Sequence, residues 1–145
     1  MGRADPRPRG RRTAIVVAVA CLCLAGLAIA AWQPWHAGSV EDPAAVSGGR
    51  ALAQACAVCH ALERGAPPRV GPPLWGVVGR PVGSVDGFGY SHTLATAEGS
   101  WTPERLDHFL ANPAAALPGN AMTFVGMADA DDRARVIAFL RTLSD

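Results

Sequence analysis

The sequence predicts an all-α domain of about four to five helices with long loops, preceded by an N-terminal transmembrane helix. Two observations indicate the helical domain: apolar residues recur at helical spacing, and glycine and proline clusters interrupt the stretches between them. No stretch has a convincing strand pattern. A third observation, an uncharged apolar run near the N-terminus, indicates the transmembrane helix.

The first 32 residues have the pattern of a membrane signal-anchor. Residues 1–12 form a basic cytoplasmic flank with five arginines and one acid, and residues 13–32 contain no charge. The apolar core 14–31 has 18 residues. As a helix it would be about 27 Å long, which nearly matches a hydrocarbon core of about 30 Å. Because basic flanks stay cytoplasmic, the rest of the chain is expected on the periplasmic side of the cytoplasmic (inner) membrane.

A cleaved signal peptide is the alternative, because Ala28-Ile29-Ala30 offers a small-residue cleavage site. Signal peptides usually have an apolar region of about 7–15 residues. The longer run found here favours an uncleaved single-pass anchor. In both cases the remaining domain lies outside the cytoplasm.

A linker is expected over residues 33–47, which hold two prolines, two acids and mostly small residues without a helical period. Fully extended, this segment spans at most about 50 Å. The folded domain is expected over residues 48–145, which carry eight arginines and nine acids. This balance leaves no basic face and excludes a nucleic-acid-binding domain.

The first two helices of the domain lie on either side of a long loop. One is expected to begin at Gly48-Gly49 and to continue with apolar residues at helical spacing. Glycine and proline interrupt residues 65–90, which are expected to be loop. The other helix is a short one over residues 91–97, with Ser91 as its N-cap.

The last two helices have clearer start signals. Thr102 is a good N-cap and Pro103 fits the first helical position, so the third helix begins there and ends at Asn112-Pro113. The fourth and strongest helix covers residues 129–143, with acids in its first turn and apolar residues along one side.

The motif around which the domain is organised is Cys56-Ala57-Val58-Cys59-His60. Two cysteines three apart with a histidine directly after them have the spacing that attaches a haem covalently. A zinc site would need further ligands at metal spacing, and the only other cysteines, Cys21 and Cys23, lie in the apolar run. A thioredoxin-like dithiol would be expected near a βαβ pattern, which the sequence lacks. Haem attachment is therefore the favoured interpretation.

The domain resembles the class I cytochromes c of the mitochondrial and bacterial c2 type. Residues 71–80 are similar to the family's G-P-x-L-x-G-x-x-G-R loop, and residues 118–124 are similar to its P-G-T-K-M-x-F methionine loop. The spacing between these motifs needs no insertion or deletion. The resemblance implies the cytochrome c fold around one covalent haem c per chain. In that fold the first and last helices cross, and the residues expected at the crossing are Gly48, Leu52, Val136 and Phe139.

The resemblance also implies individual roles at the matching positions. Cys56 and Cys59 would carry the thioether bonds to the haem. His60 and Met122 would be the axial iron ligands. The Pro72 carbonyl would accept the other ring N–H of His60 and fix its tautomer. The remaining haem-binding residues, several of them at the family's positions for propionate contacts, would be Arg80, Tyr90, Trp101 and Phe124.

A few residues depart from the family pattern or compete with it. Met127 is a rival sulfur ligand, but Met122 is favoured because it lies in the proline–glycine loop. Asn120 replaces the threonine of that loop, and Phe109 replaces a tyrosine close to the methionine. The histidines without a matching role, which are expected to be solvated, are His36, His92 and His108.

The function implied by the resemblance is electron transfer. One haem would pass single electrons between a quinol–cytochrome c reductase and a terminal oxidase, or between equivalent respiratory or photosynthetic complexes at the bilayer. A permanent subunit of a larger oxidoreductase and a soluble periplasmic cytochrome c2 after signal cleavage are alternatives. A haem sensor or weak peroxidase is less favoured, because Met122 would have to leave the iron. With both axial positions filled, no enzymatic activity and no small-molecule substrate are expected.

Overall fold

The computed structural model of the protein describes residues 42–145. This part of the chain contains six helices, α2 to α7, and no strand; one isolated antiparallel bridge joins Pro81 and Ser100. The all-α prediction is confirmed here. None of these helices has the length and apolar character needed to cross a bilayer. The predicted membrane span, residues 13–32, lies outside the described residues.

Helix α2 (Pro43–Leu52) begins before the predicted start at Gly48-Gly49. Asp42 is its N-cap, and the Asp42 Oδ1 accepts a hydrogen bond from the Ala44 N–H at 2.9 Å. Pro43 occupies the first turn, where its missing N–H would have had no helical partner. Residues 43–47, expected to belong to the linker, are therefore helical. After Ala53 the chain continues into α3 (Gln54–Ala57).

The middle helices begin at the predicted caps. Ser91 precedes α4 (His92–Ala95), and its Oγ accepts from the Leu94 N–H at 3.4 Å. Thr102 precedes α5 (Pro103–Ala111) and satisfies an N–H of its first turn in the same way. Local side-chain chemistry fixes both starts.

Helix α6 (Pro113–Ala116) was not expected, because Asn112-Pro113 was interpreted only as the end of the preceding helix. Asn112 both ends α5 and caps α6, since its Oδ1 accepts from the Ala115 N–H at 3.1 Å. The last helix, α7 (Ala130–Arg141), has acids in its first turn, as predicted, but Asp129 is its N-cap and it ends two residues before the predicted Leu143.

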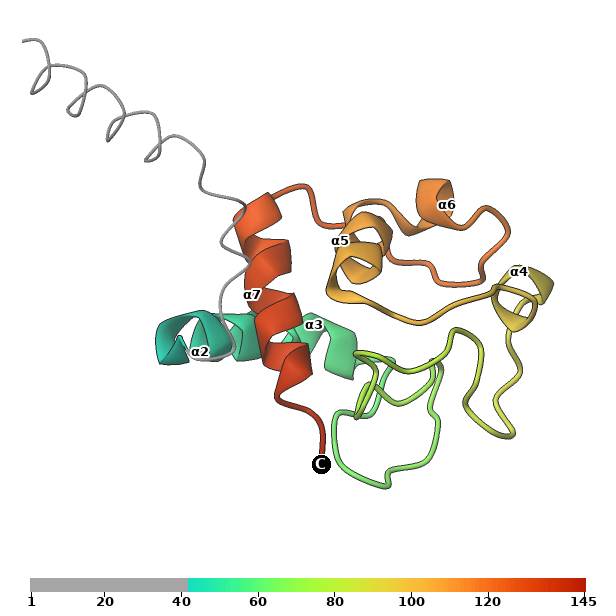
Figure 1. Cartoon of the computed structure of the whole chain (residues 1–145), viewed down its shortest axis with the longest axis horizontal. Helices are drawn as coiled ribbons and strands as arrows, with labels where there is room; N and C mark the ends of the chain where they lie inside the picture. Colours follow the sequence, from blue (N-terminus) through green and yellow to red (C-terminus); the bar gives the residue numbers. More distant parts are fainter. Residues whose placement is uncertain (1–41) are drawn as a thin grey trace, which may run out of the picture. The chain divides into compact units, whose positions relative to one another are not determined.

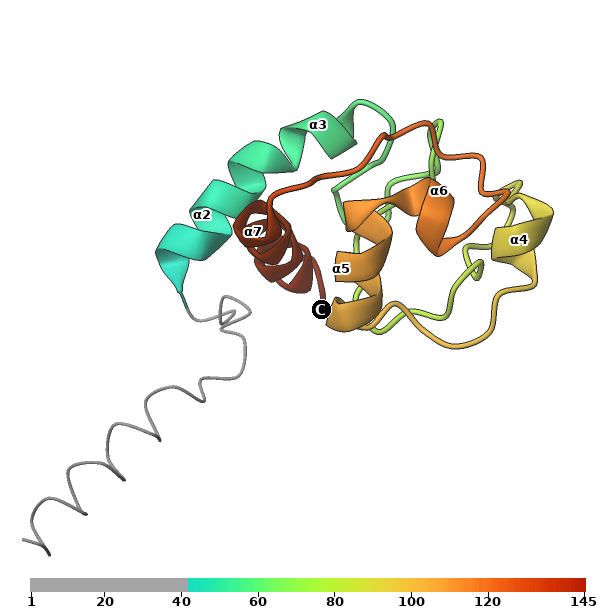
Figure 2. The same ribbon diagram turned by 90° about the horizontal axis from the view of Figure 1, so that it is seen from above.

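The crossing of α2 and α7 is the most extensive contact between helices in this part of the chain (Figures 1 and 2). Gly49 is the buried residue of α2, and a Cβ placed on it would overlap the Arg135 main chain and lie 2.9 Å from the Phe139 Cβ. A Cβ on Gly48 would meet only the flexible Arg135 side chain, at 3.3 Å. The expected role of Gly48 at the crossing therefore belongs to Gly49.

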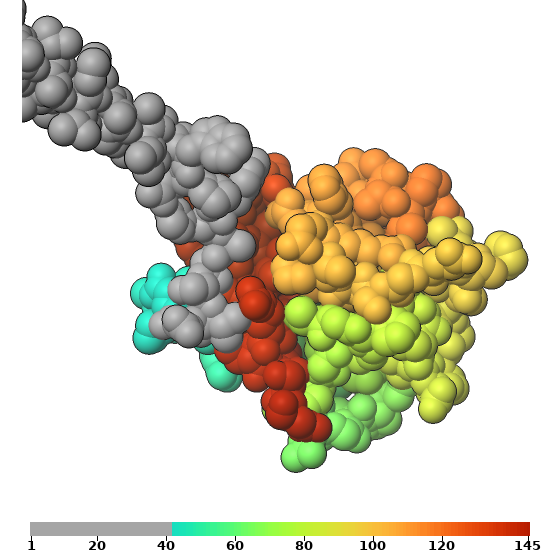
Figure 3. Space-filling view, viewed as in Figure 1, coloured from blue at the N-terminus to red at the C-terminus, as the bar shows by residue number. Residues whose placement is uncertain are grey.

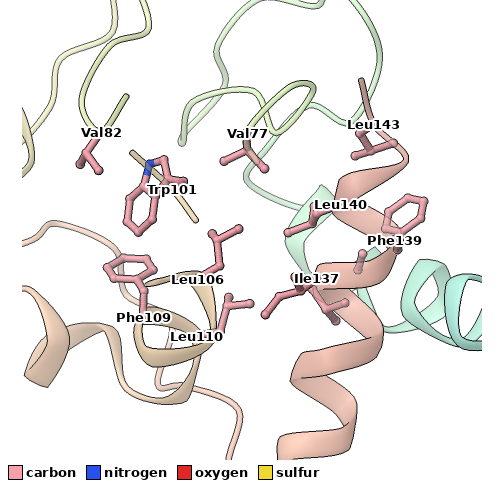
Figure 4. Close-up of a cluster of buried hydrophobic side chains, with 12 residues drawn as sticks. Val77, Val82, Trp101, Leu106, Phe109, Leu110, Ile137, Phe139, Leu140 and Leu143 are labelled. Carbon is pink, nitrogen blue, oxygen red and sulfur yellow. The ribbon is translucent and has the colours of Figure 1, made fainter. Parts of the chain in front are cut away.

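The hydrophobic core lies between α7, α5 and the loops. In Figure 4, Ile137 and Leu140 extend from α7 toward Leu106 and Leu110 of α5, whereas Phe139 points away, on the side of α2. Figure 3 shows the corresponding surface, on which α7 (red) lies between α2 (teal) and α5 (amber). Helix α7 is therefore buried on two sides, and it joins α2 to the rest of the domain.

Replacing Gly49 by alanine should destabilise the protein. The added methyl group has no space at the crossing, and overpacking costs about 1–3 kcal/mol, more than the gain of up to about 1 kcal/mol in helix propensity. The measurement is the free energy of unfolding in urea. The matched control is Gly48→Ala, which should be neutral or slightly stabilising; equal effects of the two substitutions would contradict the assignment of the crossing to Gly49.

Candidate functional site

The two motif cysteines lie at the end of α3 and in the turn after it. The N–H groups of Cys59 and His60 both donate to the Cys56 carbonyl, at 3.1 and 2.9 Å, so the turn keeps a helical geometry. Spacing of three residues then places both thiols on one side of the chain. Both cysteines are half-buried, and they do not form a disulfide with each other. Burial raises the pKa of the Cys56 thiol, a main-chain hydrogen bond lowers it in part, and the nearby Cys59 raises it further.

The His60 ring is held in one orientation by Pro72. The His60 Nδ1 lies 2.6 Å from the Pro72 carbonyl oxygen, which can only accept a hydrogen bond. Nδ1 is therefore the donor of this bond, and in the neutral imidazole Nε2 has the lone pair. The structure shows the hydrogen bond expected between these two residues, and Nε2 is the ring nitrogen that remains and could bind a metal.

Gly71 provides the surface on which the His60 ring rests. A Cβ placed on Gly71 would lie 2.6 Å from the His60 Nδ1 and 2.7 Å from its Nε2. Gly71 is buried and its backbone does not adopt the left-handed conformation. The position therefore requires glycine for space and not for backbone freedom.

The loop that carries Pro72 is tied to the cysteine motif by main-chain hydrogen bonds. The Gly71 N–H donates to the Cys59 carbonyl at 2.8 Å, and the Leu74 N–H donates to the Ala61 carbonyl at 2.8 Å. The Arg69 guanidinium donates to the Ala57 carbonyl at 3.1 Å. Motif and loop thus form one hydrogen-bonded unit.

Arg80 is half-buried and spans the same loop. Its guanidinium donates to the Pro73 carbonyl at 2.8 Å and to the Trp75 carbonyl at 3.1 Å. Burial lowers the pKa of Arg80, while the nearby Tyr90 raises it. A guanidinium has five N–H donors, so donors remain after these two bonds. Arg80 is therefore a charged group near Tyr90 with hydrogen bonds still to give.

The two other predicted aromatic residues lie in different surroundings. Trp101 is buried, and its ring packs against Phe109 with the ring centroids 5.0 Å apart. Tyr90 is half-buried and meets Phe88 edge to face at 4.7 Å. A hollow of about 710 Å³ beside α5 and α6 includes Trp101 and Phe109 in its wall. Neither the cysteines nor His60 line it, so this hollow does not define the site.

Met122 and Phe124 are half-buried and pack against the hydrophobic core. Met127 does so too, which means that burial does not separate the two candidate sulfurs. Their main chains differ, however. The Met127 N–H donates to the Leu110 carbonyl at 2.8 Å and its carbonyl accepts from Arg133 at 2.9 Å, which fixes this residue beside α5 and α7.

Gly71 and Asn120 belong to motifs recognised in the sequence, but the contacts that they make in the site were not predicted. Gly71 belongs to a recognised motif, but its contact with His60 is visible only in three dimensions. Asn120 accepts a hydrogen bond from the Met122 N–H at 2.9 Å. An asparagine two residues before a main-chain N–H often makes this turn, so its position relative to Met122 was an available signal.

The donor set fits a covalently attached haem. Two thiols three residues apart can form thioether links, and the adjacent imidazole can offer its Nε2 to the iron. No cluster of three or more His, Cys, Asp or Glu side chains that could hold a metal ion occurs among residues 42–145. His92 and His108 are exposed, as expected, and His36 lies outside the described range.

Replacing Gly71 by alanine should displace the His60 ring and destabilise the purified protein by about 1–3 kcal/mol, because the methyl group overlaps the imidazole. Urea unfolding measures this effect. The matched control is Gly89→Ala, where the added Cβ meets nothing within 4 Å and the backbone is not left-handed. That control should change the unfolding free energy by no more than about 0.5 kcal/mol. A tolerated Gly71→Ala would contradict the tight packing of the ring.

Comparison with known proteins shows similarity to cytochromes c. No protein-family model matches the chain. It is 44% identical over 107 residues to the "Cytochrome c-type cyt cy" of Rhodobacter capsulatus, a match that covers 70% of this chain and 53% of the relative. It is 42% identical over 121 residues to a "Cytochrome c homolog" of Bradyrhizobium diazoefficiens, covering 83% and 65%. The chain thus spans between half and two thirds of these two relatives.

Two further comparisons cover most of the other protein. The chain is 41% identical over 108 residues to the cytochrome c2 of Rhodomicrobium vannielii, which covers 74% of this chain and 86% of the relative. Among solved structures, cytochrome cH from Methylobacterium extorquens matches with a TM-score of 0.62 and 34% identity, covering 67% and 97%. The predicted cytochrome c fold is therefore confirmed. The chain belongs to the class I c-type cytochromes, and its cofactor is haem c attached through Cys56 and Cys59.

Proposed function

We propose that the protein is a one-haem electron carrier in which His60 and Met122 are the axial ligands. The observation that carries this proposal is the His60 geometry: Nδ1 donates to the Pro72 carbonyl at 2.6 Å, so Nε2 is free to bind iron directly beside Cys59. When bound, the haem supplies reversible one-electron exchange at its iron. The chain's part is to hold both ligands and to keep water from the metal.

The surrounding residues would stabilise the haem in the pocket. Arg80 carries a positive charge close to Tyr90, and both suit a buried propionate. Trp101 has an indole N–H that can serve the same group, and Phe124 would pack against the ring edge. If His60 and Met122 both hold the iron, no position would be open for a substrate. We therefore favour a carrier over a peroxidase or a sensor, each of which would need Met122 to dissociate.

Replacing Met122 by alanine should remove the thioether ligand and lower the reduction potential, because a soft sulfur donor stabilises reduced iron. We expect a fall of about 0.1 V or more, within the range of about 0.8 V over which axial ligands set haem potentials. The measurements are a potentiometric titration and the optical band of methionine-ligated iron. Met127→Ala is the control and should preserve both. An unchanged band and potential in Met122→Ala would disprove the ligand assignment.

We further propose that residues 13–32 anchor the haem domain to the periplasmic side of the cytoplasmic membrane. The support is the uncharged run behind a basic flank. A tethered carrier would meet partners embedded in the same bilayer, such as a quinol–cytochrome c reductase and a terminal oxidase or an equivalent complex. A permanent subunit of one such complex would share this location, and it would differ by co-purifying stably with its partner.

The full-length protein should fractionate with membranes and resist extraction by alkaline carbonate, because a helix of about 20 apolar residues inserts stably. Haem staining and N-terminal sequencing of the mature protein provide the measurement. A matched control replaces residues 1–32 by a cleavable signal peptide and should yield soluble periplasmic protein with the same spectrum. A soluble wild-type protein with an N-terminus after Ala30 would favour the soluble cytochrome c2 instead.

A further inference from the structure

The side chain of Asn120 makes three hydrogen bonds that join the methionine loop to α6. Its Nδ2 donates to the Pro113 carbonyl and to the Leu117 carbonyl, both at 2.8 Å. Its Oδ1 accepts from the Met122 N–H at 2.9 Å. Asn120 is half-buried, so these bonds are partly shielded from water.

These partners require a carboxamide. Two carbonyl oxygens need two N–H donors, and one main-chain N–H needs an acceptor, so the orientation of the amide is unambiguous. A threonine, which the related loop has at this position, has one hydroxyl and cannot make all three bonds. An aspartate has the same shape but no donors, and its charge would face two carbonyl oxygens.

The rest of the loop is also held in place. The Asn120 N–H donates to the Leu117 carbonyl at 3.1 Å, and the Thr93 hydroxyl donates to the Pro118 carbonyl at 2.9 Å. Gly119 has a left-handed φ of 84°, which lets the chain turn back toward α6. Of these contacts, only the Asn120 side chain reaches the main chain of Met122.

We propose that Asn120 is a positioning residue for Met122, holding its main chain against α6 so that the thioether stays on the iron. This inference rests on the proposed His60–Met122 ligation. An iron–thioether bond competes with external ligands, and the competition depends on how freely the methionine segment can move away. Losing the Asn120 bonds should therefore make Met122 easier to displace, without changing the identity of the ligand at rest.

The test is the affinity of free imidazole for the oxidised holoprotein, since imidazole must displace Met122 to bind. Asn120→Asp and Asn120→Ala should each tighten imidazole binding by about tenfold, the effect of one good hydrogen bond. The matched control, Thr93→Val, removes a hydrogen bond to the same loop but none to Met122, and should change the affinity by less than about threefold. Urea unfolding of each variant separates loop opening from global stability.

The outcomes separate this inference from the proposed function. If the wild-type protein lacks the band of methionine-ligated iron, the ligand proposal fails. If that band is present but both Asn120 variants bind imidazole within about threefold of wild type, the positioning role alone is overturned. An equal increase in imidazole affinity in Thr93→Val would also overturn it, because any weakening of the loop, and not the loss of the Asn120 bonds in particular, would then release Met122. If the aspartate variant does not accumulate, Asn120→Ser replaces it, because serine lacks the two amide donors and introduces no charge. Imidazole binding within about threefold of wild type in that variant would likewise overturn the positioning role.

Discussion

The close approach of α2 and α7 at Gly49 is the constraint on which the domain depends. Because the glycine has no side chain, the main chain of α2 reaches the Arg135 carbonyl, and the Arg50 guanidinium lies over the Phe139 ring at 5.1 Å. Helix α3 follows α2 after a single residue, so this crossing also sets where the cysteines stand. The opposite side of α7 packs against α5, which carries Phe109. Helix α7 thus joins the helix that leads to the cysteine motif to α5 on the other side of the domain.

The two sides of the site are built differently. His60, Pro72 and the cysteines are joined by hydrogen bonds between segments close in sequence, so ordering them closes only a short loop and costs little entropy. Met122 comes from much farther along the chain, and its position depends on the segment between α6 and α7, residues 117–129. The C-terminal end of this segment is held by Arg133, which forms an ion pair with Asp107 at 2.7 Å and donates a hydrogen bond to the Met127 carbonyl. The Arg133 side chain is only 11% exposed, so this ion pair is better shielded from water than a fully exposed ion pair would be.

Much of the fold could be predicted from the sequence, because its signals are local. Thr102 and Asp129 cap the helices that follow them, and each cap depends on groups within one turn. The start of α2 was missed, although Asp42-Pro43 is itself a cap signal, because the small and acidic residues around it suggested a linker. Other features needed the third dimension. The choice of Gly49 over Gly48 depends on the facing helix. The positions of His60 and Pro72 in the site followed from a motif, whereas the bonds of the Asn120 amide to the Pro113 and Leu117 carbonyls required knowing that α6 exists.

The early start of α2 changes the geometry of the proposed anchoring. Because α2 begins at Pro43, ten residues, 33–42, separate the predicted membrane span from α2. Their contour length is at most roughly 35 Å, against about 50 Å for the longer segment expected from sequence. The volume above the bilayer that the haem domain could reach scales with the cube of this length. It is therefore roughly a third of the volume expected with the longer linker. If residues 13–32 anchor the domain as proposed, the shorter linker would concentrate the haem domain around its immediate neighbours in the membrane and put more distant acceptors out of its reach.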